Sequence, residues 1–222
     1  MIKVLNLYAG IGGNRKLWGG GIEVTAVENN PQIAKVYQEF FSKDKVVVAD
    51  AHQYLLEHFE EFDFIWSSPP CPSHSRMRWI IQQHEGCKYK FPDMKLYEEI
   101  IFLKTWFKGK WVVENVISYY EPLVKPFECG NHYFWSNFFI TNKKLGSRLV
   151  RRNHDNVLKR QKTWGFDEIK NFGLSESKYR EFLQQIINNC VEPELGLHVF
   201  NCAFKGKQTN LSWAEKQAGE KK

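Results

Sequence analysis

The stretch VLNLYAGIGG, Val4–Gly13, decides the fold, because an apolar run typical of a buried β-strand leads directly into a glycine-rich turn. Glycines at a strand-to-helix turn let backbone N–H groups approach a ligand closely and place a helix N-terminus beside it. By itself such a turn does not identify a ligand. It predicts the start of a βαβ arrangement with a ligand site where the first strand ends.

The rest of the first half continues this pattern, with short apolar runs alternating with longer amphipathic segments. Pro31 opens one predicted helix, and apolar residues at helical spacing mark another around Leu96–Phe107. Parallel strands joined by helices form an open sheet that is covered on both faces, with ligands at the carboxyl ends of the strands. We therefore expect an α/β, Rossmann-like fold with a mostly parallel sheet. Its predicted strands are Val4–Tyr8, Glu23–Val27, Lys45–Val48, Phe62–Trp66 and Trp111–Glu114.

The second half is organised differently. After about residue 120 the alternation stops, and His132–Ile140 is predicted to form one aromatic-rich strand, in a hairpin or alone. Ser175 is expected to cap a helix, and Pro193 to open another helical run. The polar, lysine-rich tail from Lys205 is expected to be frayed.

Composition restricts the class of protein. The chain has 222 residues and a formal net charge of +6, and no apolar run approaches the roughly 18 residues of a membrane span. Its five cysteines are widely spaced and form no C-x-x-C pair, which argues against a disulfide framework and a zinc cluster. The N-terminus has no signal-peptide pattern. We expect a cytoplasmic protein with reduced thiols, no metal and no membrane contact.

Acidic residues follow the second and third predicted strands, and they suggest a cofactor. Glu28 stands where such folds hold the ribose hydroxyls of a nucleoside, and Asp50 could accept a hydrogen bond from an adenine amino group. Either carboxylate alone would more simply be a helix cap or a solvated loop residue. Together with the glycine turn they predict an adenosine-containing cofactor.

The fourth and fifth predicted strands bring a thiol and a carboxylate to the same edge. Pro69 and Pro70 form a stiff turn that aims Cys71 away from the sheet, and Glu114 ends the fifth strand. A buried structural cysteine fits less well within the polar sequence SSPPCPSHS. A thiol and a carboxylate that converge beside an adenosine site could activate an electron-poor ring by covalent addition.

A basic segment follows the aromatic strand and is opposed only by Asp155. It is either an ordinary solvated face or a surface that contacts nucleic-acid phosphates, and we favour phosphates. Its residues are Lys143, Lys144, Arg148, Arg151, Arg152, Lys159, Arg160 and Lys162.

The ordered series YAGIGG, VENN, ADAHQ, SPPCPSHS, ENV and NNCVEPELG resembles the motifs of the cytosine-C5 DNA methyltransferases, from about Val4 to Phe200. The resemblance implies a class I methyltransferase fold, S-adenosylmethionine as cofactor and duplex DNA as partner. It implies that Cys71 adds to C6 of a flipped cytosine while Glu114 hydrogen-bonds or protonates N3. The implied cofactor residues are Tyr8, Gly10, Gly12, Glu28, Asp50, Pro70 and Asn189; the implied substrate residues are Ser68, Asn115, Asn131, His132 and Arg76.

The same resemblance divides the chain. Residues 1–140 would be the catalytic, cofactor-binding domain, 141–178 a short basic target-recognition segment, 179–204 a C-terminal helix returning to the catalytic domain, and 205–222 a polar tail. In this scheme Lys143, Lys144, Arg148, Arg151, Arg152, Lys159 and Arg160 contact the DNA backbone.

Two departures from the family pattern bear on activity. The family's arginine pair before the late aromatic strand is replaced by Cys129-Gly130-Asn131-His132, which offers no fixed, always-charged fork. The recognition region is only about forty residues long, Thr141–Lys178, and its charge fits phosphate contact better than base reading. A short target site or a partner subunit would agree with this.

Alternatives stay open at this point. The SPPC sequence also resembles the loops of amino-methyltransferases, which would methylate the exocyclic N4, and the same fold could methylate cytosine in tRNA. A catalytically silent DNA-binding subunit is the alternative from another class. A role in restriction-modification, in regulation or in phage self-protection is equally open.

The sequence also leaves several polar and aromatic residues without a functional role. We expect the histidines His74, His84 and His154 to lie on the surface or in polar loops, because no second ligand stands at metal spacing. The tryptophans are expected in the core or in interfaces, with Trp79 after Arg76-Met77-Arg78 as a candidate for base stacking. These tryptophans are Trp18, Trp79, Trp106, Trp135, Trp164 and Trp213.

Overall fold

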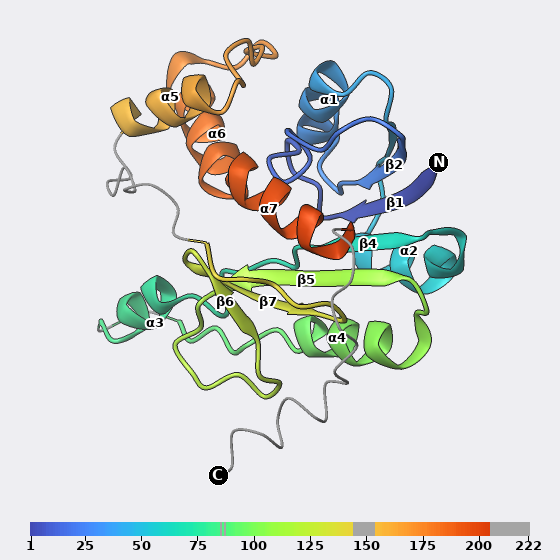
Figure 1. Ribbon diagram of the computed structural model, residues 1–222. Helices are drawn as coiled ribbons and strands as arrows, with labels where there is room; N and C mark the ends of the chain where they lie inside the picture. The colour runs from blue at the N-terminus through green and yellow to red at the C-terminus, as the bar shows by residue number, and fades with distance from the viewer. Residues whose placement is uncertain (85, 87, 144–153, 205–222) are drawn as a thin grey trace.

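The computed structural model describes residues 1–84, 86, 88–143 and 154–204. Within them, seven strands form one sheet, with helices packed on both of its faces (Figure 1). The strands are β1 Ile2–Leu7, β2 Ile22–Val27, β3 Lys45–Val47, β4 Phe64–Ser67, β5 Lys110–Val116, β6 Phe127–Cys129 and β7 His132–Ser136. The helices are α1 Pro31–Phe40, α2 Ala51–His58, α3 Arg76–Gln82, α4 Lys95–Trp106, α5 His154–Thr163, α6 Glu176–Asn188 and α7 Pro193–Phe204.

The sheet has the strand order β3-β2-β1-β4-β5-β7-β6. The first five strands along the chain pair in parallel, whereas β7 pairs antiparallel with both β5 and β6. The predicted α/β, Rossmann-like fold with a mostly parallel sheet is therefore confirmed. Because β7 runs the other way, its first residues lie at the same edge as the carboxyl ends of the parallel strands.

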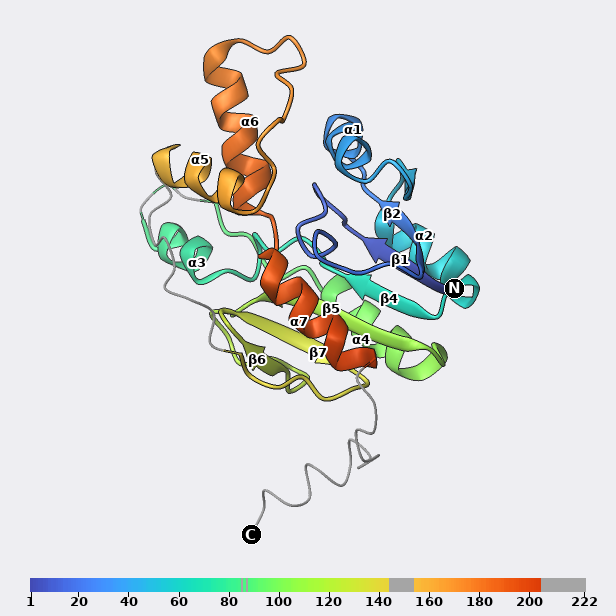
Figure 2. The same cartoon turned by 45° about the horizontal axis from the view of Figure 1, so that its top comes forward.

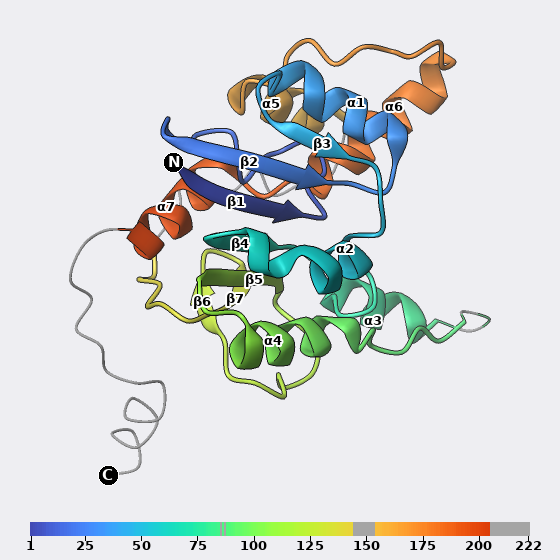
Figure 3. The same ribbon diagram turned by 90° about the vertical axis from the view of Figure 1, so that its right-hand side faces the viewer.

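Alternation along the strands explains the two-sided core. Leu5, Leu7 and Ile65 face α2 and α4, while Val4 and Phe64 face α7. The residues Leu96, Ile100, Leu103 and Phe107, predicted to form one apolar face, are all buried in the first of these layers. Figure 3 shows α1 and α4 on opposite sides of the strands.

The glycine turn differs from its prediction, because no helix follows β1 in the described residues 8–21. This segment consists of turns and bends up to β2. Six of its fourteen residues are glycine, and glycine in a helix costs roughly 1 kcal/mol relative to alanine. The helix whose N-terminus faces the ligand edge is α1 instead, which begins after β2 and is capped by Asn30.

The aromatic strand ends earlier than predicted, at Ser136 rather than at Ile140. Its partner β5 starts at Lys110, and the last pair between the two strands joins Val112 to Ser136. Beyond it Asn137 accepts a hydrogen bond from Trp111 N at 3.1 Å through Oδ1, and its Nδ2 donates to Gly109 O at 2.8 Å. The side chain of Asn137 therefore closes the ladder where β5 begins.

The region predicted as one returning helix, residues 179–204, contains α7 and most of α6. Asn189 is the C-cap of α6, and Pro193 opens α7, which crosses one face of the sheet (Figure 2) and packs on residues of β1, β4, β5 and β7. Helices α5 and α6 pack with α1 in a separate apolar cluster that includes Ile11. The C-terminal part thus covers the edge at which the glycine turn lies.

Candidate active site

A cavity of about 360 Å³ lies at the carboxyl edge of the parallel strands, in the size range of small-molecule sites. Its walls come from the ends of β1, β2, β4 and β5, the start of β7, and the link between α6 and α7. The predicted site residues that line it are Tyr8, Gly10, Glu28, Ser68, Pro70, Cys71, Glu114, Asn115, His132 and Asn189.

Glu28 organises the wall formed by the glycine turn. Its side chain is almost fully buried, and its two carboxylate oxygens accept hydrogen bonds from Gly10 N at 3.0 Å and Asn30 N at 2.9 Å. Gly10 has a φ of +54° with open space where a Cβ would stand. The carboxylate of Glu28 thus holds the turn after β1 and the N-terminus of α1 together. A carboxylate at this position is also suited to accept hydrogen bonds from a ligand with vicinal hydroxyls.

Tyr8 forms an aromatic part of the same wall. Its φ is +53°, in the left-handed region where a residue other than glycine is strained by roughly 1–3 kcal/mol. Its hydroxyl donates to the Glu99 carboxylate at 2.6 Å. Burial, and then the nearby Glu99 charge, raise the pKa of Tyr8 well above its usual value, so the phenol stays protonated.

The Cys71 loop is held to the sheet from both sides. The carbonyl of Cys71 accepts hydrogen bonds from His74 N at 3.0 Å and Ser75 N at 3.2 Å, which closes a turn after the prolines. On β5, the buried amide of Asn115 donates to Pro69 O at 3.0 Å. The loop is therefore fixed relative to Glu114, the residue before Asn115.

Glu114 faces His132 across the β5–β7 pair. Glu114 is opposite Phe134 and Val116 is opposite His132, so the two polar side chains lie on one face of the pair. His132 Nε2 is 3.7 Å from Glu114 Oε1, while the buried Nδ1 of His132 has no hydrogen-bond partner within the described part of the chain. This nitrogen is one polar group in the cavity wall that a ligand could satisfy.

The link after α6 closes the cavity from the C-terminal side. A Cβ on Gly13 would stand 2.1 Å from Cys190 Sγ, so the glycine turn packs directly against this link. Cys190 also lines the cavity, but burial raises the pKa of its thiol to about 12. Of the two cysteines that line the cavity, Cys190 is therefore the one that stays protonated and unreactive near neutral pH.

Comparison with protein-family models gives one match, the family described as C-5 cytosine-specific DNA methylase, over residues 2–116. The match covers just over half of the chain and includes Glu28, Cys71 and Glu114. The chain belongs to this family. S-adenosylmethionine is the methyl donor that membership of this methylase family implies.

Comparisons with whole proteins are more distant. No curated protein matches this chain. Among solved structures, a mutant of Spodoptera frugiperda DNMT2 is 25% identical, with a TM-score of 0.38 over 52% of this chain and 36% of that one. An Agrobacterium tumefaciens SAM-dependent methyltransferase is 16% identical, with a TM-score of 0.37, over 54% and 40%. The Entamoeba histolytica methyltransferase EhMeth is 12% identical, with a TM-score of 0.48, over 92% and 98%.

The cavity has the features that this cofactor needs. The ligand would find an acceptor for ribose hydroxyls in Glu28, an aromatic wall in Tyr8, and apolar surface from Ile11 and Ile33. The chain thus offers a nucleoside-sized pocket that is lined in part by the Cys71 loop.

Four predicted site residues do not line the cavity. Gly12 packs against α1 instead, because a Cβ there would stand 2.3 Å from the Phe41 ring. Asp50 is exposed and caps α2 by accepting from Gln53 N at 2.9 Å. Arg76 donates to Ser118 O at 3.3 Å, and Asn131 is exposed in the β6–β7 turn. Their roles in binding cofactor or substrate stay predictions.

The predicted DNA-backbone residues are only partly described, since Lys144, Arg148, Arg151 and Arg152 lie outside the described residues. Lys143 Nζ is 4.0 Å from Glu194, and Lys159 is exposed on α5. Arg160 is engaged within the protein: its Nη2 donates to Asn188 Oδ1 at 2.5 Å, and its guanidinium lies 5.6 Å from the Trp164 ring centroid. A structural role for Arg160 therefore competes with phosphate contact.

His74 lies in the polar loop between β4 and α3, one of the two locations predicted for it, but its side chain is buried. Its Nδ1 lies 2.5 Å from the Tyr120 hydroxyl, and burial lowers its pKa. His84 is exposed as expected, and the His154 side chain lies outside the described residues.

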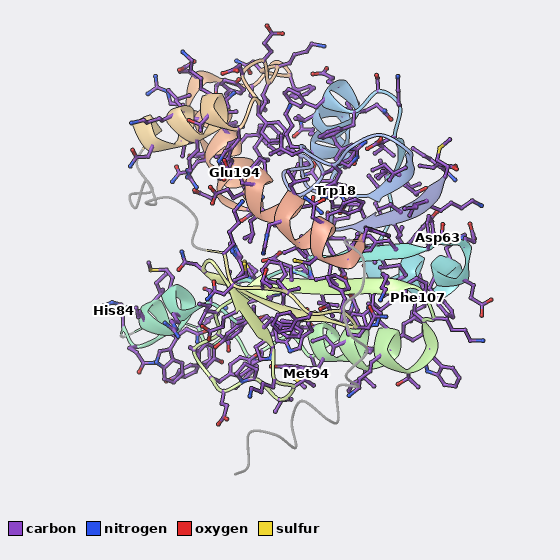
Figure 4. The ribbon with its side chains drawn as sticks, in the orientation of Figure 1. Trp18, Asp63, His84, Met94, Phe107 and Glu194 are labelled. Carbon is purple, nitrogen blue, oxygen red and sulfur yellow. The ribbon has the colours of Figure 1, made fainter. Side chains whose placement is uncertain are left out.

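Trp18, labelled in Figure 4, donates to Gly196 O at 3.3 Å and is buried beside α7. Trp135 is buried too, whereas Trp106 is exposed; Trp79 is half exposed and stacks on Tyr119 with ring centroids 4.9 Å apart. Trp213 lies outside the described residues.

Sequence reasoning missed several polar residues of the cavity. Asn30 caps α1, and its place directly before Pro31 is a helix-start signal. Gln185 and Asn188 on α6 line the cavity together with Asn189, and their spacing of three and four residues puts them on one helix face. Among the described residues no group of three or more His, Cys, Asp or Glu could hold a metal. None of the described helices is long and apolar enough to cross a membrane.

Proposed function

We propose that the protein transfers a methyl group from S-adenosylmethionine to C5 of cytosine in duplex DNA, with Cys71 as the nucleophile and Glu114 as the proton donor. The observation that carries this proposal is that Cys71, Glu114 and Glu28 line one cavity. Carbon methylation of an electron-poor ring requires a nucleophile, an acid and a group that holds the nucleoside of the cofactor, all within one cavity.

Addition of the thiolate is the first covalent step. The Cys71 Sγ forms a bond to C6 of cytosine while N3 takes a proton from Glu114, so the electron pair of the C5–C6 bond becomes available at C5. C5 would then form a bond to the methyl carbon as the bond from that carbon to the cofactor's sulfur breaks, which would leave S-adenosylhomocysteine as the product of the cofactor. A base removes the C5 proton, the Sγ–C6 bond breaks, and the N3 proton returns to Glu114.

The protein has to hold the base outside the duplex during these steps. Flipping the nucleotide costs roughly a few kcal/mol, which contacts to the DNA backbone and to the base must offset. Ser68, Asn115 and His132 line the cavity and supply a hydroxyl, an amide and an imidazole near the base position. In this proposal His132 takes the place of the family's arginines beside Glu114.

The cofactor side belongs to Tyr8, Gly10, Glu28, Pro70 and Asn189. Glu28 would exchange its backbone partners or share them with ribose hydroxyls, and Gly10 leaves open space for the ligand. Asn189, at the C-cap of α6, would close this side through the link to α7. Asp50 does not line the cavity, so it would contact an adenine only if the ligand extended beyond the cavity.

The nucleophile is tested by Cys71→Ser. We expect methyl transfer to cytosine DNA to fall by at least about 1,000-fold, and covalent trapping on 5-fluorocytosine DNA to disappear, because serine is a far weaker nucleophile at neutral pH. The measurement is methyl incorporation from labelled S-adenosylmethionine, with trapped complexes counted on denaturing gels. Cys202→Ser is the matched control, since Cys202 on α7 lies beside Thr141 and His198 and does not line the cavity. Persistent transfer by Cys71→Ser would favour N4 methylation instead.

A silent DNA-binding subunit is the alternative that one observation favours, namely the absence of arginine from Cys129–His132 before β7. Tight DNA binding without methyl incorporation, alone or with a partner, would support it. Competition between duplex DNA and tRNA as substrates would distinguish DNA methylation from tRNA methylation. Bisulfite sequencing of DNA from expressing cells would give both the modified atom class and the recognised site.

A further inference from the structure

A fully buried carboxylate lies beneath the cavity and has no role in the proposed chemistry. Glu99 on α4 has an exposed fraction of 0%, within a helix face that is otherwise apolar. Burying an ionised carboxylate is costly unless hydrogen bonds and a charge partner compensate it. Such a residue at this position therefore needs an explanation in what it contacts.

Glu99 gathers hydrogen-bonding groups from three other elements. Its Oε1 accepts from the Tyr8 hydroxyl at 2.6 Å and lies 3.0 Å from His52 Nδ1 on α2. Its Oε2 accepts from Ser67 Oγ at 2.5 Å, at the end of β4. We name Tyr8, His52, Ser67 and Glu99 the Glu99 cluster. Every polar contact of the carboxylate is thus made to a group at or near the carboxyl edge of the sheet.

Two members of the cluster continue directly into the cavity walls. Tyr8 lines the cavity in its strained left-handed conformation, and the bond to Glu99 fixes its ring there. Ser67 is followed by Ser68–Pro72, all of which line the cavity, with Cys71 among them. The cavity wall formed by Tyr8 and the strand end that leads into the Cys71 loop are therefore both hydrogen-bonded to the carboxylate of Glu99.

We propose that Glu99 is a positioning residue of the methylase, which sets the turn that carries Tyr8 against the strand end that carries Cys71. This rests on the proposed function, because the separation of these walls matters when a methyl group passes from one side to a base held on the other. A displacement of about 1 Å between reacting groups can cost about 100-fold in rate. The carboxylate adds side-chain hydrogen bonds from Tyr8 and Ser67 to the backbone pairing of β1 with β4.

The test compares three variants with a matched control. Glu99→Gln keeps the size of the side chain but removes the charge and one acceptor; Tyr8→Phe and Ser67→Ala each remove one bond at its outer end. Glu98→Gln is the control, since Glu98 is the neighbouring residue, is exposed, and reaches only His52, at 3.4 Å. The readouts are single-turnover methyl transfer at saturating cofactor and DNA, binding of S-adenosylhomocysteine by calorimetry, and the His52 imidazole signal by NMR.

We expect Glu99→Gln to lower the single-turnover rate by about 10- to 100-fold, with the KM for DNA changed by less than about twofold. Tyr8→Phe should weaken S-adenosylhomocysteine binding as well as the rate, whereas Ser67→Ala should lower the rate and leave that binding intact. Glu98→Gln should match the wild type in both. The His52 signal reports whether the cluster has changed in each protein.

The proposal is overturned if Glu99→Gln transfers methyl groups at the wild-type rate while the His52 signal has moved. It is also overturned if the loss in all three variants disappears at a temperature where each is fully folded, which would mean that the cluster only stabilises the fold. A wild-type protein that transfers no methyl group to DNA would instead reject the proposed function. In that case unchanged S-adenosylhomocysteine binding in Tyr8→Phe still overturns the positioning role.

Discussion

His52 is the member of the Glu99 cluster whose charge can change near neutral pH. Its Nδ1 faces Glu99 at 3.0 Å and its Nε2 faces Glu98 at 3.4 Å, while the charge of Lys95 on α4 acts to lower its pKa. The hydrogen bond to Glu99 raises the pKa of His52, against the desolvation that burial imposes. When His52 is protonated, its imidazolium supplies a counter-charge to the buried carboxylate.

A raised pKa in the folded state makes a stability contribution that is complete below the unfolded value of about 6.5 and is lost as pH rises through the folded value. We expect His52→Gln to cost about 1 kcal/mol of unfolding free energy near pH 5.5, and less near pH 9. Urea unfolding of both proteins at the two pH values measures the difference. Glu98→Gln should keep most of the pH dependence, because the bond to Glu99 is the largest cause. A cost that does not vary with pH would contradict this account.

At the scale of elements, α7 can pack closely on the glycine turn because Gly196 has no side chain. A Cβ on Gly196 of α7 would stand 2.3 Å from Asn14 O and 2.5 Å from Asn14 Cα. Asn14 is itself fixed, since its amide donates to Asn6 Oδ1 on β1 at 2.7 Å. Both sides of the contact are backbone, so neither can move aside without displacing the turn that forms the cofactor wall.

We expect Gly196→Ala to destabilise the fold by about 1–3 kcal/mol, since overpacking against backbone outweighs the roughly 1 kcal/mol that alanine gains over glycine in a helix. S-adenosylhomocysteine should also bind more weakly, because Asn14 and Gly13 line the cavity. Thermal unfolding and calorimetry measure the two effects. Gly20→Ala is the control, with nothing within 4 Å of its added Cβ. A Gly196→Ala protein as stable as the wild type would show that α7 is less tightly seated than its contacts indicate.

At the scale of the whole molecule, the formal charge of +6 suits a partner with a phosphate backbone. Its basic side chains are not equivalent. Lys159 is exposed on α5, whereas Arg160, the next residue, bonds to Asn188 and lies over the Trp164 ring. The first is available to a phosphate, and the second holds α5 to α6.

This difference predicts opposite results for neighbouring substitutions. Lys159→Ala should reduce the slope of log K against log salt for duplex DNA by about 0.9, with unchanged thermal stability. Arg160→Ala should lower thermal stability, because Asn188 loses a charged partner, and should leave that slope nearly unchanged. Fluorescence anisotropy across a salt series and thermal unfolding check both. Equal salt slopes for Lys159→Ala and the wild type would remove Lys159 from the DNA interface.

Sequence patterns were sufficient to predict the strand-ending residues that meet at the site. Residues at the carboxyl ends of parallel strands share one edge, so the order of the apolar runs was enough to bring Glu28, Cys71 and Glu114 together. The apolar faces of α1 and α4 followed from helical periodicity for the same reason, since each depends only on local spacing. Asp50 shows the limit of this reasoning, because a strand-end carboxylate can equally cap the next helix.

Contacts between residues far apart in the chain became visible only in the folded protein. Glu99 stands three residues after Leu96 and four before Leu103, so helical spacing places this acidic residue on the apolar face of α4. Its partners Tyr8 and His52 come from other parts of the chain, and the spacing within α4 does not predict them. The close packing of Gly196 on Asn14 has the same origin. Contacts between distant segments depend on how the layers pack in three dimensions, and no pattern along a single strand or helix contains that information.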